Sequence, residues 1–318
     1  MKISVVDGGS GVMFEFAEAI GANISGRFIY IPENKGGGYI TGFNWGNLRM
    51  MIRNYHLNEE VIIERTNEFA EGQDDVVIML SGVFTSASKT EEQLMREKAN
   101  VIICKHAVTS VMDMPSNTIF ESVTIAVSRE YLRLLFGNVK HSVVETILES
   151  NDNFVFETGI SADIIRAAGE IQNQAVPESF ESYFYKLKCK ELLCYIFTLL
   201  MQREQIPTSN MHIDDIKSIY NIKLRLESNL NESPNIKSMA IEAGMSEPKL
   251  RKLFKQTFGK GVFEYYQSLR MQEAAMLLKE KRLTVSEVGY QLGFTNLSHF
   301  SRVFEEHIGI KPKKYSMS

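Results

Sequence analysis

The last third of the chain contains one pattern of apolar residues and glycine twice. Residues 236–245 align with residues 285–294, and residues 250–265 align with residues 300–315 after a one-residue insertion in the second copy. Self-similarity at a fixed offset indicates one structural unit used twice. The segment therefore predicts two similar modules within a single chain.

Each copy predicts a helix, a tight turn and a second helix. In the first copy Gly244 ends the first helix, because glycine adopts the left-handed conformation at low cost, and Ser246 is placed to cap the second helix. In the second copy Gly293 makes the turn, and Thr295 or Asn296 provides the cap. Both copies are thus expected to form helix-turn-helix modules.

The second helix of each copy has an apolar face and a polar face. The expected buried residues are Leu250, Leu253, Phe254, Phe258, Phe300, Val303, Phe304 and Ile308. The residues left on the outside are Lys249, Arg251, Lys252, Lys255, Gln256, Ser298, His299, Ser301 and Arg302. Between the copies, residues 262–280 have a continuous helical pattern about 28 Å long. Successive major-groove faces of B-DNA lie about 34 Å apart, so one chain is able to read two adjacent grooves.

Many positions of the repeat match a known family. They include Ala240, Ala243–Ser246, Leu250, Leu253–Lys255, Phe258–Gly259, Arg270–Met271, Ala274, Leu277–Leu278, Val285, Val288–Gly289, Gly293–Phe294, Phe300–Phe304, Gly309, Pro312 and Tyr315. On these residues, the segment 236–318 resembles the DNA-binding domain of the AraC/XylS family of transcription regulators. The resemblance implies seven helices, the first at 213–230, sequence-specific binding of double-stranded DNA, usually activation of transcription, and RNA polymerase as a partner.

The resemblance also implies which residues meet DNA. Base edges would be read by Glu247, Pro248, Arg251, Lys252, Asn296, Ser298, His299 and Arg302. Phosphates would be held by Lys249, Lys255 and the helix N-termini. The alternative for each basic residue is a solvated helix face. Glu305 and Glu306 follow Phe304 where family members commonly carry a basic residue, and Ser316 stands where an arginine is frequent. We therefore expect the first module to anchor binding.

Charge is divided unevenly along the chain. Residues 213–318 hold 17 Lys and Arg against 12 Asp and Glu, whereas residues 1–212 hold 18 against 27. A basic C-terminal third favours a polyanionic partner, with chance surface charge as the alternative.

The first 128 residues are typical of short strands. Residues 122–128 alternate apolar and small polar side chains, residues 48–53 do so less regularly, and residues 76–80 and 101–104 are short apolar runs. Turns are expected at Gly8–Gly9, Gly36–Gly38 and Gly72. The expected fold is α+β, with an N-terminal cupin-like β-sandwich and flanking helices followed by an all-α C-terminal domain that has two helix-turn-helix units.

Helices are expected after residue 128. Ser128 would cap 129–136, Ser161 would open the next helix, and Ser179 would open a helix over 180–203. The second half of that last helix is apolar nearly all round, so it should be buried against a partner subunit or against the protein's own strand domain. The expected domains are a sensing domain over 1–150, a helical linker and dimerisation segment over 151–210, and the DNA-binding domain over 211–318, assembled as a homodimer.

In this family an N-terminal domain usually senses a ligand, dimerises, or both. A small-molecule effector would be held by Phe28, Tyr30, Tyr39, Phe43 and Trp45, unless these aromatic residues form the sandwich core. The cupin metal pattern is absent and the early histidines are scattered (His56, His106, His141 and His212), so no metal or other cofactor is expected.

No catalytic motif is present, so we do not expect an enzyme and assign no catalytic residue. The longest apolar run, 192–201, is about half of a membrane span, and no signal peptide is seen; a cytoplasmic protein without membrane contact is expected. The sequence predicts an effector-controlled transcription activator. Two alternatives are a cupin-type enzyme tethered to DNA and a ligand-independent DNA-binding regulator.

Overall fold

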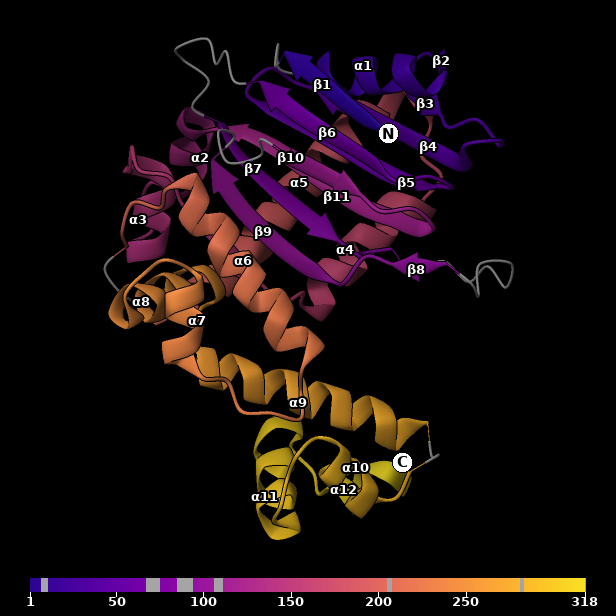
Figure 1. Cartoon of the computed structure of the whole chain (residues 1–318). Helices are drawn as coiled ribbons and strands as arrows, with labels where there is room; N and C mark the ends of the chain where they lie inside the picture. Colours follow the sequence, from indigo (N-terminus) through magenta and orange to yellow (C-terminus); the bar gives the residue numbers. More distant parts are fainter. Residues whose placement is uncertain are drawn as a thin grey trace. The chain divides into compact units, whose positions relative to one another are not determined.

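The chain folds into two compact units. The computed structural model describes residues 1–6, 11–66, 75–84, 94–105, 111–204, 208–280 and 283–317. The first unit comprises residues 1–210 and the second residues 211–318 (Figure 1). The described part of the first unit combines strands with helices, whereas that of the second is helical. The α+β class expected from the sequence is confirmed, while the cupin-like character of the sheets stays a prediction.

Two β-sheets form the first unit. Among the described residues the larger sheet has nine strands, in the order β12-β9-β7-β11-β5-β4-β3-β2 with β8 paired to β11, and the smaller sheet has the order β1-β6-β10. The strands are Lys2–Val6 (β1), Asn23–Ser25 (β2), Phe28–Tyr30 (β3), Gly36–Asn44 (β4), Leu48–Leu57 (β5), Val61–Thr66 (β6), Asp75–Ser81 (β7), Met95–Arg96 (β8), Asn100–Lys105 (β9), Val111–Met114 (β10), Thr118–Ser128 (β11) and Val155–Thr158 (β12). The strands predicted from the sequence lie within β5, β7, β9 and β11.

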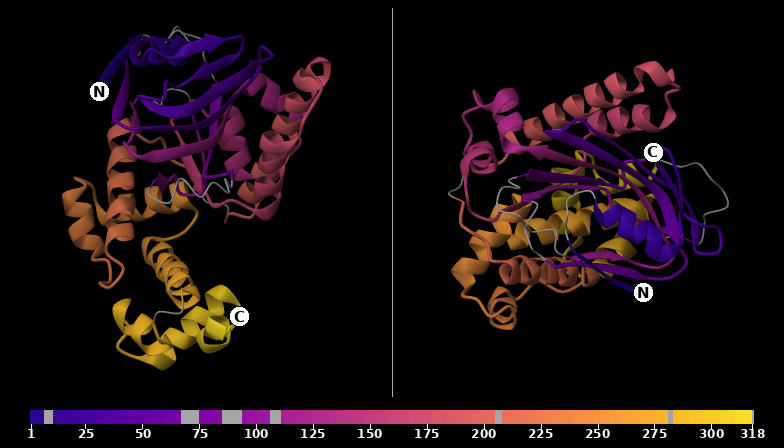
Figure 2. Two further views of the ribbon diagram at one scale, coloured as in Figure 1. Left: turned by 90° about the vertical axis from the view of Figure 1, so that its right-hand side faces the viewer. Right: turned by 90° about the horizontal axis from the view of Figure 1, so that it is seen from above.

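Helices pack against these sheets. They are Gly11–Ile20 (α1), Arg129–Phe136 (α2), Ser142–Glu149 (α3), Ala162–Asn173 (α4) and Glu178–Met201 (α5). Ser128 and Ser161 cap α2 and α4 as predicted, since each hydroxyl accepts a hydrogen bond from a backbone N–H of the first turn. Figure 2 shows α4 and α5 side by side along one face of the larger sheet, and residues of α2 to α5 share a core with that face.

Strand β5 buries a different face in each of its halves. Met50 and Ile52 point into the core shared with helices α2–α5, whereas Tyr55 and Leu57 point into a second core formed with α1 and the smaller sheet. Its neighbour β11 is paired with it throughout and contributes to both cores. Successive side chains of a strand alternate between faces, so the change of buried face explains the irregular alternation in the sequence.

The glycines at 36–38 lie inside strand β4, so the expected turn there is wrong. A Cβ atom at Gly36 would lie 2.0 Å from the carbonyl oxygen of His56 on β5. The two backbones approach too closely for a side chain, which is a reason for glycine within a strand. The other predicted glycine turns, at Gly8–Gly9 and Gly72, lie outside the described residues.

Helix α5 begins at Glu178 after Pro177, so the expectation that Ser179 opens it is wrong. Proline suits the start of a helix because its missing N–H would have no partner there. The second half of α5 packs into the core of its own unit, where Leu193 and Ile196 are fully buried. Of the two partners considered for this half, the protein's own strand domain is the one observed.

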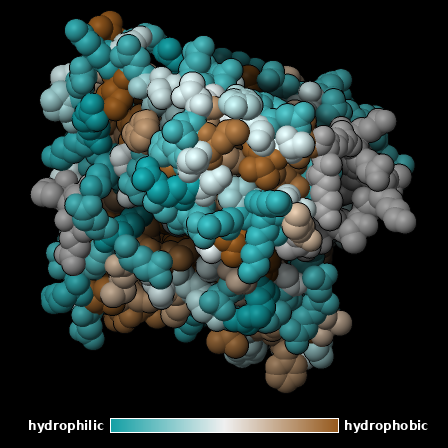
Figure 3. All heavy atoms as spheres, turned by 90° about the horizontal axis from the view of Figure 1, so that it is seen from below, coloured by the Kyte–Doolittle hydropathy of each residue, from teal (hydrophilic) through white to brown (hydrophobic). Residues whose placement is uncertain are grey.

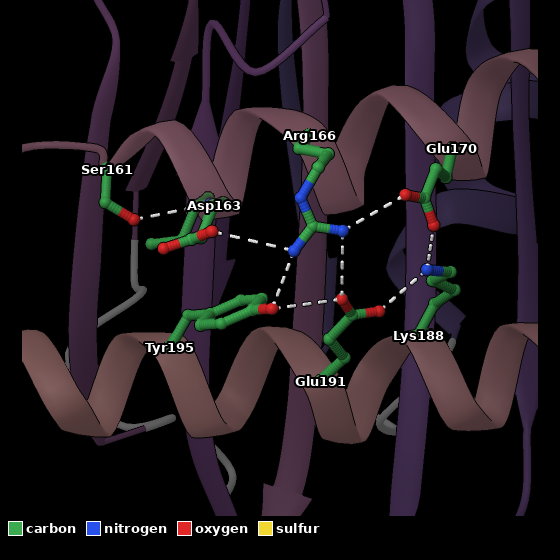
Figure 4. Close-up of polar contacts among 8 residues, drawn as sticks. Ser161, Asp163, Arg166, Glu170, Lys188, Glu191 and Tyr195 are labelled. Atoms are coloured by element: carbon green, nitrogen blue, oxygen red, sulfur yellow. Dashed lines mark hydrogen bonds and ion pairs between the residues drawn. The ribbon is translucent and has the colours of Figure 1, made fainter.

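Charged side chains join α4 to α5 (Figure 4). Arg166 on α4 donates a hydrogen bond to the Tyr195 hydroxyl at 2.7 Å, and its Nη1 lies 3.6 Å from Glu191 Oε1; both partners are on α5. Lys188 Nζ lies 2.7 Å from Glu191 Oε2 and also pairs with Glu170 on α4. The ion pairs of Arg166, whose side chain is 51% exposed, contribute about 0–1 kcal/mol each, whereas Lys188 is buried and needs its two carboxylate partners to offset the loss of water.

The second unit has seven helices among its described residues. They are Ile213–Ser228 (α6), Ile236–Glu242 (α7), Glu247–Phe258 (α8), Val262–Lys279 (α9), Val285–Gln291 (α10), Leu297–Ile308 (α11) and Pro312–Met317 (α12). The sequence repeat corresponds to the pairs α7–α8 and α10–α11. Helix α9 joins the two pairs with 18 residues, about 27 Å at 1.5 Å per residue.

Arg270 on α9 holds the turn of the second pair. Its guanidinium donates two hydrogen bonds to the carbonyl oxygen of Leu292, at 3.1 Å from Nε and 2.5 Å from Nη2, and lies 3.7 Å from the ring centroid of Phe294. The last carbonyls of a helix have no intrahelical partner, so Arg270 satisfies one at the end of α10. Burial lowers the pKa of this arginine.

The face drawn in Figure 3 is mainly hydrophilic. The side of the molecule drawn in Figure 3 shows polar residues broken by separate apolar patches. The exposed large apolar residues of the second unit are Leu224, Ile241, Phe263, Met276, Tyr290 and Met317. Within the described residues, no helix combines the length and the apolar character that crossing a membrane requires.

Gly244 and Gly293 occupy the same turn position, with φ of +65° and +77°. A Cβ atom at Gly293 would lie 2.0 Å from the carbonyl oxygen of Asn231, whereas nothing lies within 4 Å of one at Gly244. We expect Gly244→Ala to cost about 1–2 kcal/mol for the left-handed backbone. Gly293→Ala should cost at least about 2 kcal/mol more, because backbone must also move. Urea denaturation followed by circular dichroism measures both, and equal losses would contradict the packing described.

Candidate nucleic-acid interface

The two helix pairs turn with the same backbone hydrogen bonds. The N–H of Met245 donates to the carbonyl of Ala240 at 3.0 Å, and the N–H of Phe294 donates to the carbonyl of Gly289 at 2.9 Å. In each case the preceding residue is a glycine with positive φ. This is the bond that closes a Schellman motif, so both modules aim their second helix by the same local geometry.

Side-chain caps fix where those second helices begin. The Ser246 hydroxyl accepts a hydrogen bond from the N–H of Lys249 at 3.4 Å. Asn296 Oδ1 accepts from the N–H groups of Ser298 and His299 at 2.9 and 3.1 Å, which decides between the two predicted caps in favour of Asn296. Because its oxygen is engaged in capping, Asn296 has only its amide NH₂ group left for a nucleic-acid base.

The packed faces of α8 and α11 agree with the sequence with one exception. Leu250, Leu253, Phe254, Phe258, Phe300, Val303 and Phe304 are buried, and Ile308 is half-buried. Gln256 was expected outside, but it is only 2% exposed. It follows Leu253 by three positions, which places it on the packed face of the helix.

The predicted DNA-contacting residues lie on the outer faces of these helices. The exposed ones are Pro248, Lys249, Arg251, Lys252, Asn296, Ser298, His299 and Arg302, and the half-buried ones are Glu247 and Lys255. In α8, the spacing of Pro248, Arg251, Lys252 and Lys255 places them along one stripe of the helix. The predicted contact residues of α8 and those of α11 are thus at least partly accessible on the surface of the second unit.

Carboxylates pair with two of the cations on α8. Arg251 Nη2 lies 3.7 Å from Glu247 Oε2 within the helix, and Lys249 Nζ lies 2.8 Å from Asp215 Oδ1 on α6. Sequence reasoning missed Asp215, because no local pattern connects it to a lysine two helices away. Lys249 was expected to hold a phosphate, whereas in this structure it forms an ion pair inside the unit.

Helix α11 is less basic on its outer face than α8. Arg302 is exposed, and Glu305 and Glu306 are exposed one turn later. Negative side chains next to a phosphate backbone repel it, so the electrostatic attraction of α11 for a polyanion is weaker than that of α8.

The five aromatic residues considered as an effector site lie on β3, on β4 and just after β4 in the first unit. Tyr30 is 44% exposed, and Phe28, Tyr39, Phe43 and Trp45 are half-buried. The residues between them, such as Ile29 and Ile40, are the ones buried in the core. None of the five is itself a buried core residue, although Trp45 packs against the edge of the core shared with helices α2–α5.

These rings stack around an arginine and against α5. The Arg27 guanidinium lies 4.9 Å from the ring centroid of Phe28 and 4.7 Å from that of Phe43. It also pairs with Glu181 of α5, and this hydrogen bond raises the pKa of Arg27. Trp45 Nε1 donates to the hydroxyl of Ser182 on α5 at 2.9 Å. Sequence reasoning missed Arg27, since a lone arginine before a strand has no distinguishing pattern.

Acidic, histidine and cysteine side chains are the usual protein ligands of metal ions. Within the described ranges no three of them come close enough together to hold a metal ion. Of the four early histidines considered, His106 lies outside those ranges.

The second unit is similar in sequence to known DNA-binding regulators. Residues 239–318 match the family described as a helix-turn-helix domain. The probable transcription factor PqrA of Proteus vulgaris is 33% identical over 85 residues, which is 27% of this chain and 70% of PqrA. The chain belongs to the AraC/XylS family of transcription regulators.

Two further regulators match over a smaller share of their length. The transcriptional activator RhaR of Escherichia coli is 25% identical over 149 residues, 46% of this chain and 53% of RhaR. The chain covers 30% of the regulator GbdR of Pseudomonas aeruginosa. The crystal structure of ToxT from Vibrio cholerae aligns with 87% of this chain and 96% of its own, at 15% identity and a TM-score of 0.32.

Proposed function

We propose that the protein is a dimeric transcription activator that binds double-stranded DNA with its second unit and a small-molecule effector with its first. One observation carries the proposal: α8 and α11 bury their apolar faces and expose polar faces, and α9 connects the two modules. A recognition helix fits the major groove, and adjacent groove faces are about 34 Å apart. The length of α9, about 27 Å, is of that order.

The two recognition helices have unequal roles in this proposal. Arg251 reads a guanine by two hydrogen bonds, and Lys252 with Glu247 and Pro248 lines the same groove. On α11, Ser298, His299, Arg302 and the Asn296 amide face the second groove. Lys255 and the helix N-termini hold phosphates. Because Glu305 and Glu306 repel phosphates and so weaken the attraction of α11 for DNA, the first module supplies most of the affinity for DNA.

The effector site is proposed at the aromatic face of β3 and β4. Phe28, Tyr30, Tyr39, Phe43 and Trp45 offer half-exposed ring surface beside the Arg27–Glu181 pair. A ligand with a flat apolar body stacks on such rings, and its polar group exchanges with the ion pair. Since α5 contacts Trp45 and Arg27 and lies in the segment 151–210 that precedes the second unit in the chain, binding here biases that segment and through it the DNA-binding unit.

The dimer is proposed to form on the exposed side of α5. Phe180, Tyr183 and Leu187 are 63%, 75% and 63% exposed and lie at helical spacing on one stripe. The start of this helix is acidic at Glu178, whereas Lys190 follows three turns later. An antiparallel second copy places the acidic end of one helix near the basic middle of the other. Charge and apolar surface thus both fit a homodimer.

Activation through RNA polymerase is the remaining part of the proposal. The family resemblance supports it, as does the similarity to RhaR, which is a transcriptional activator.

Replacement of Arg251 by alanine should cost about 1–3 kcal/mol at one base pair and relax the preference there. Lys255→Ala should weaken all sites alike and lower the steepness of the salt dependence by about 0.9. Selection of bound duplexes from a random DNA pool, followed by affinity measurement at several salt concentrations, checks both. An unchanged base preference in Arg251→Ala would show that α8 does not read the sequence at this residue.

Effector binding should change the fluorescence of Trp45, the one tryptophan of the sequence. Its ring stacks on Phe43 and bonds to α5, so a ligand on this face alters its surroundings. We expect a metabolite that raises the melting temperature also to shift the emission, and Phe43→Ala to abolish both effects. A metabolite that stabilises the protein without affecting Trp45 would place the effector elsewhere.

Leu187→Glu should convert the dimer to a monomer, because it would bury a charge in the apolar stripe of each subunit. Leu134→Glu is the matched control, since Leu134 is 77% exposed on α2 of the same unit. Light scattering after size-exclusion chromatography gives the mass of each variant. A dimer that persists in Leu187→Glu would refute the proposed surface.

A further inference from the structure

The ion pair between Lys249 and Asp215 lies at the start of the first recognition helix. Lys249 is the third residue of α8, and its Nζ is 2.8 Å from Asp215 Oδ1. Asp215 is the third residue of α6, the helix that opens the second unit. Both residues belong to the same unit, so the contact is part of its internal structure.

The two members of the pair differ in exposure. The side chain of Lys249 is 47% exposed, whereas that of Asp215 is 13% exposed. The second carboxylate oxygen of Asp215 is buried and has no hydrogen-bond partner among the described residues. Asp215 also lies in the first turn of α6, where the helix dipole favours a negative charge. The carboxylate is therefore the more enclosed member of the pair, and the lysine is the member that solvent and a phosphate can reach.

The other cations of α8 are placed differently. Arg251 lies 3.7 Å from Glu247, and both side chains are at least 40% exposed, so solvent screens that pair and a phosphate replaces it easily. Lys252 is exposed on the same helix. Lys249, by contrast with Arg251, pairs with a carboxylate that is only 13% exposed.

A cation that is already neutralised contributes less to binding DNA. Each phosphate neutralised by a lysine releases counterions and steepens the dependence of log K on log salt by about 0.9. We infer that Asp215 is a positioning residue that holds Lys249 away from phosphates and so lowers the affinity of the first module for DNA of any sequence. Base contacts by Arg251 then make up a larger share of the binding. This inference rests on the proposed DNA-binding role of α8.

The test compares four variants of the full chain. Asp215→Asn keeps the shape and removes the charge, and Asp214→Asn removes a charge from the same turn of α6, where the Asp214 side chain is 97% exposed. Lys249→Ala and the double variant Asp215→Asn with Lys249→Ala complete the set. The probe is a fluorescein-labelled 30-base-pair duplex of random sequence, titrated by anisotropy at several salt concentrations.

We expect Asp215→Asn to tighten binding of the random duplex severalfold and to steepen the salt dependence by about 0.9, which is one additional phosphate contact. Asp214→Asn should have a clearly smaller effect on both. Lys249→Ala should leave the slope of the wild-type protein nearly unchanged. In the double variant the gain of Asp215→Asn should disappear, because its origin is the released lysine.

Three outcomes would overturn the inference. One is a slope that falls by about 0.9 in Lys249→Ala alone, since the lysine would then already contact a phosphate. Another is an equal effect of Asp214→Asn and Asp215→Asn, which would reflect net charge. The third is an unchanged slope in a folded Asp215→Asn. Lys252→Ala, measured alongside these four variants, tests the DNA-binding role of α8 separately. If it still weakens binding in these cases, that role stands. A folded wild-type protein that binds no duplex refutes the DNA-binding role and the inference about Asp215 together.

Discussion

The contact between Arg270 and the turn of the second module is the interaction on which the DNA-binding unit depends. Arg270 belongs to α9, and its guanidinium satisfies the carbonyl at the end of α10 while stacking on Phe294. On the other side of the same turn, Gly293 lies against the backbone of Asn231, in the segment that precedes α7. The second module is therefore fastened both to the connecting helix and to the start of the first module.

The positive charges on the outer faces of α8 and α11 are partly neutralised by carboxylates. Carboxylates pair with Lys249 and Arg251 on α8, and Glu305 and Glu306 follow the basic part of α11. A surface of unpaired cations would bind any duplex through counterion release. In the DNA-binding role proposed for this surface, partial neutralisation would shift the balance toward contacts with base edges, which carry the sequence information.

The first unit connects a half-exposed aromatic face to the helix that precedes the second unit. The larger sheet changes its buried face along β5, so that it contributes to two cores and leaves the aromatic side of β3 and β4 against α5. Helix α5 consequently has two functions: its second half completes the core, and its first half contacts Trp45 and Arg27 while presenting Leu187 on the surface.

The sequence by itself determined the local structure. Gly244 and Gly293 in the turns, the cap at Ser246 and the apolar stripes of α8 and α11 follow from interactions within a few residues, and the repeat made them recognisable; the choice between Thr295 and Asn296 as the second cap came from the structure. Tertiary structure decided what depends on distant residues. No local pattern predicts that Asp215 pairs with Lys249 or that Arg27 lies between aromatic rings, because each contact joins elements that are far apart in the chain.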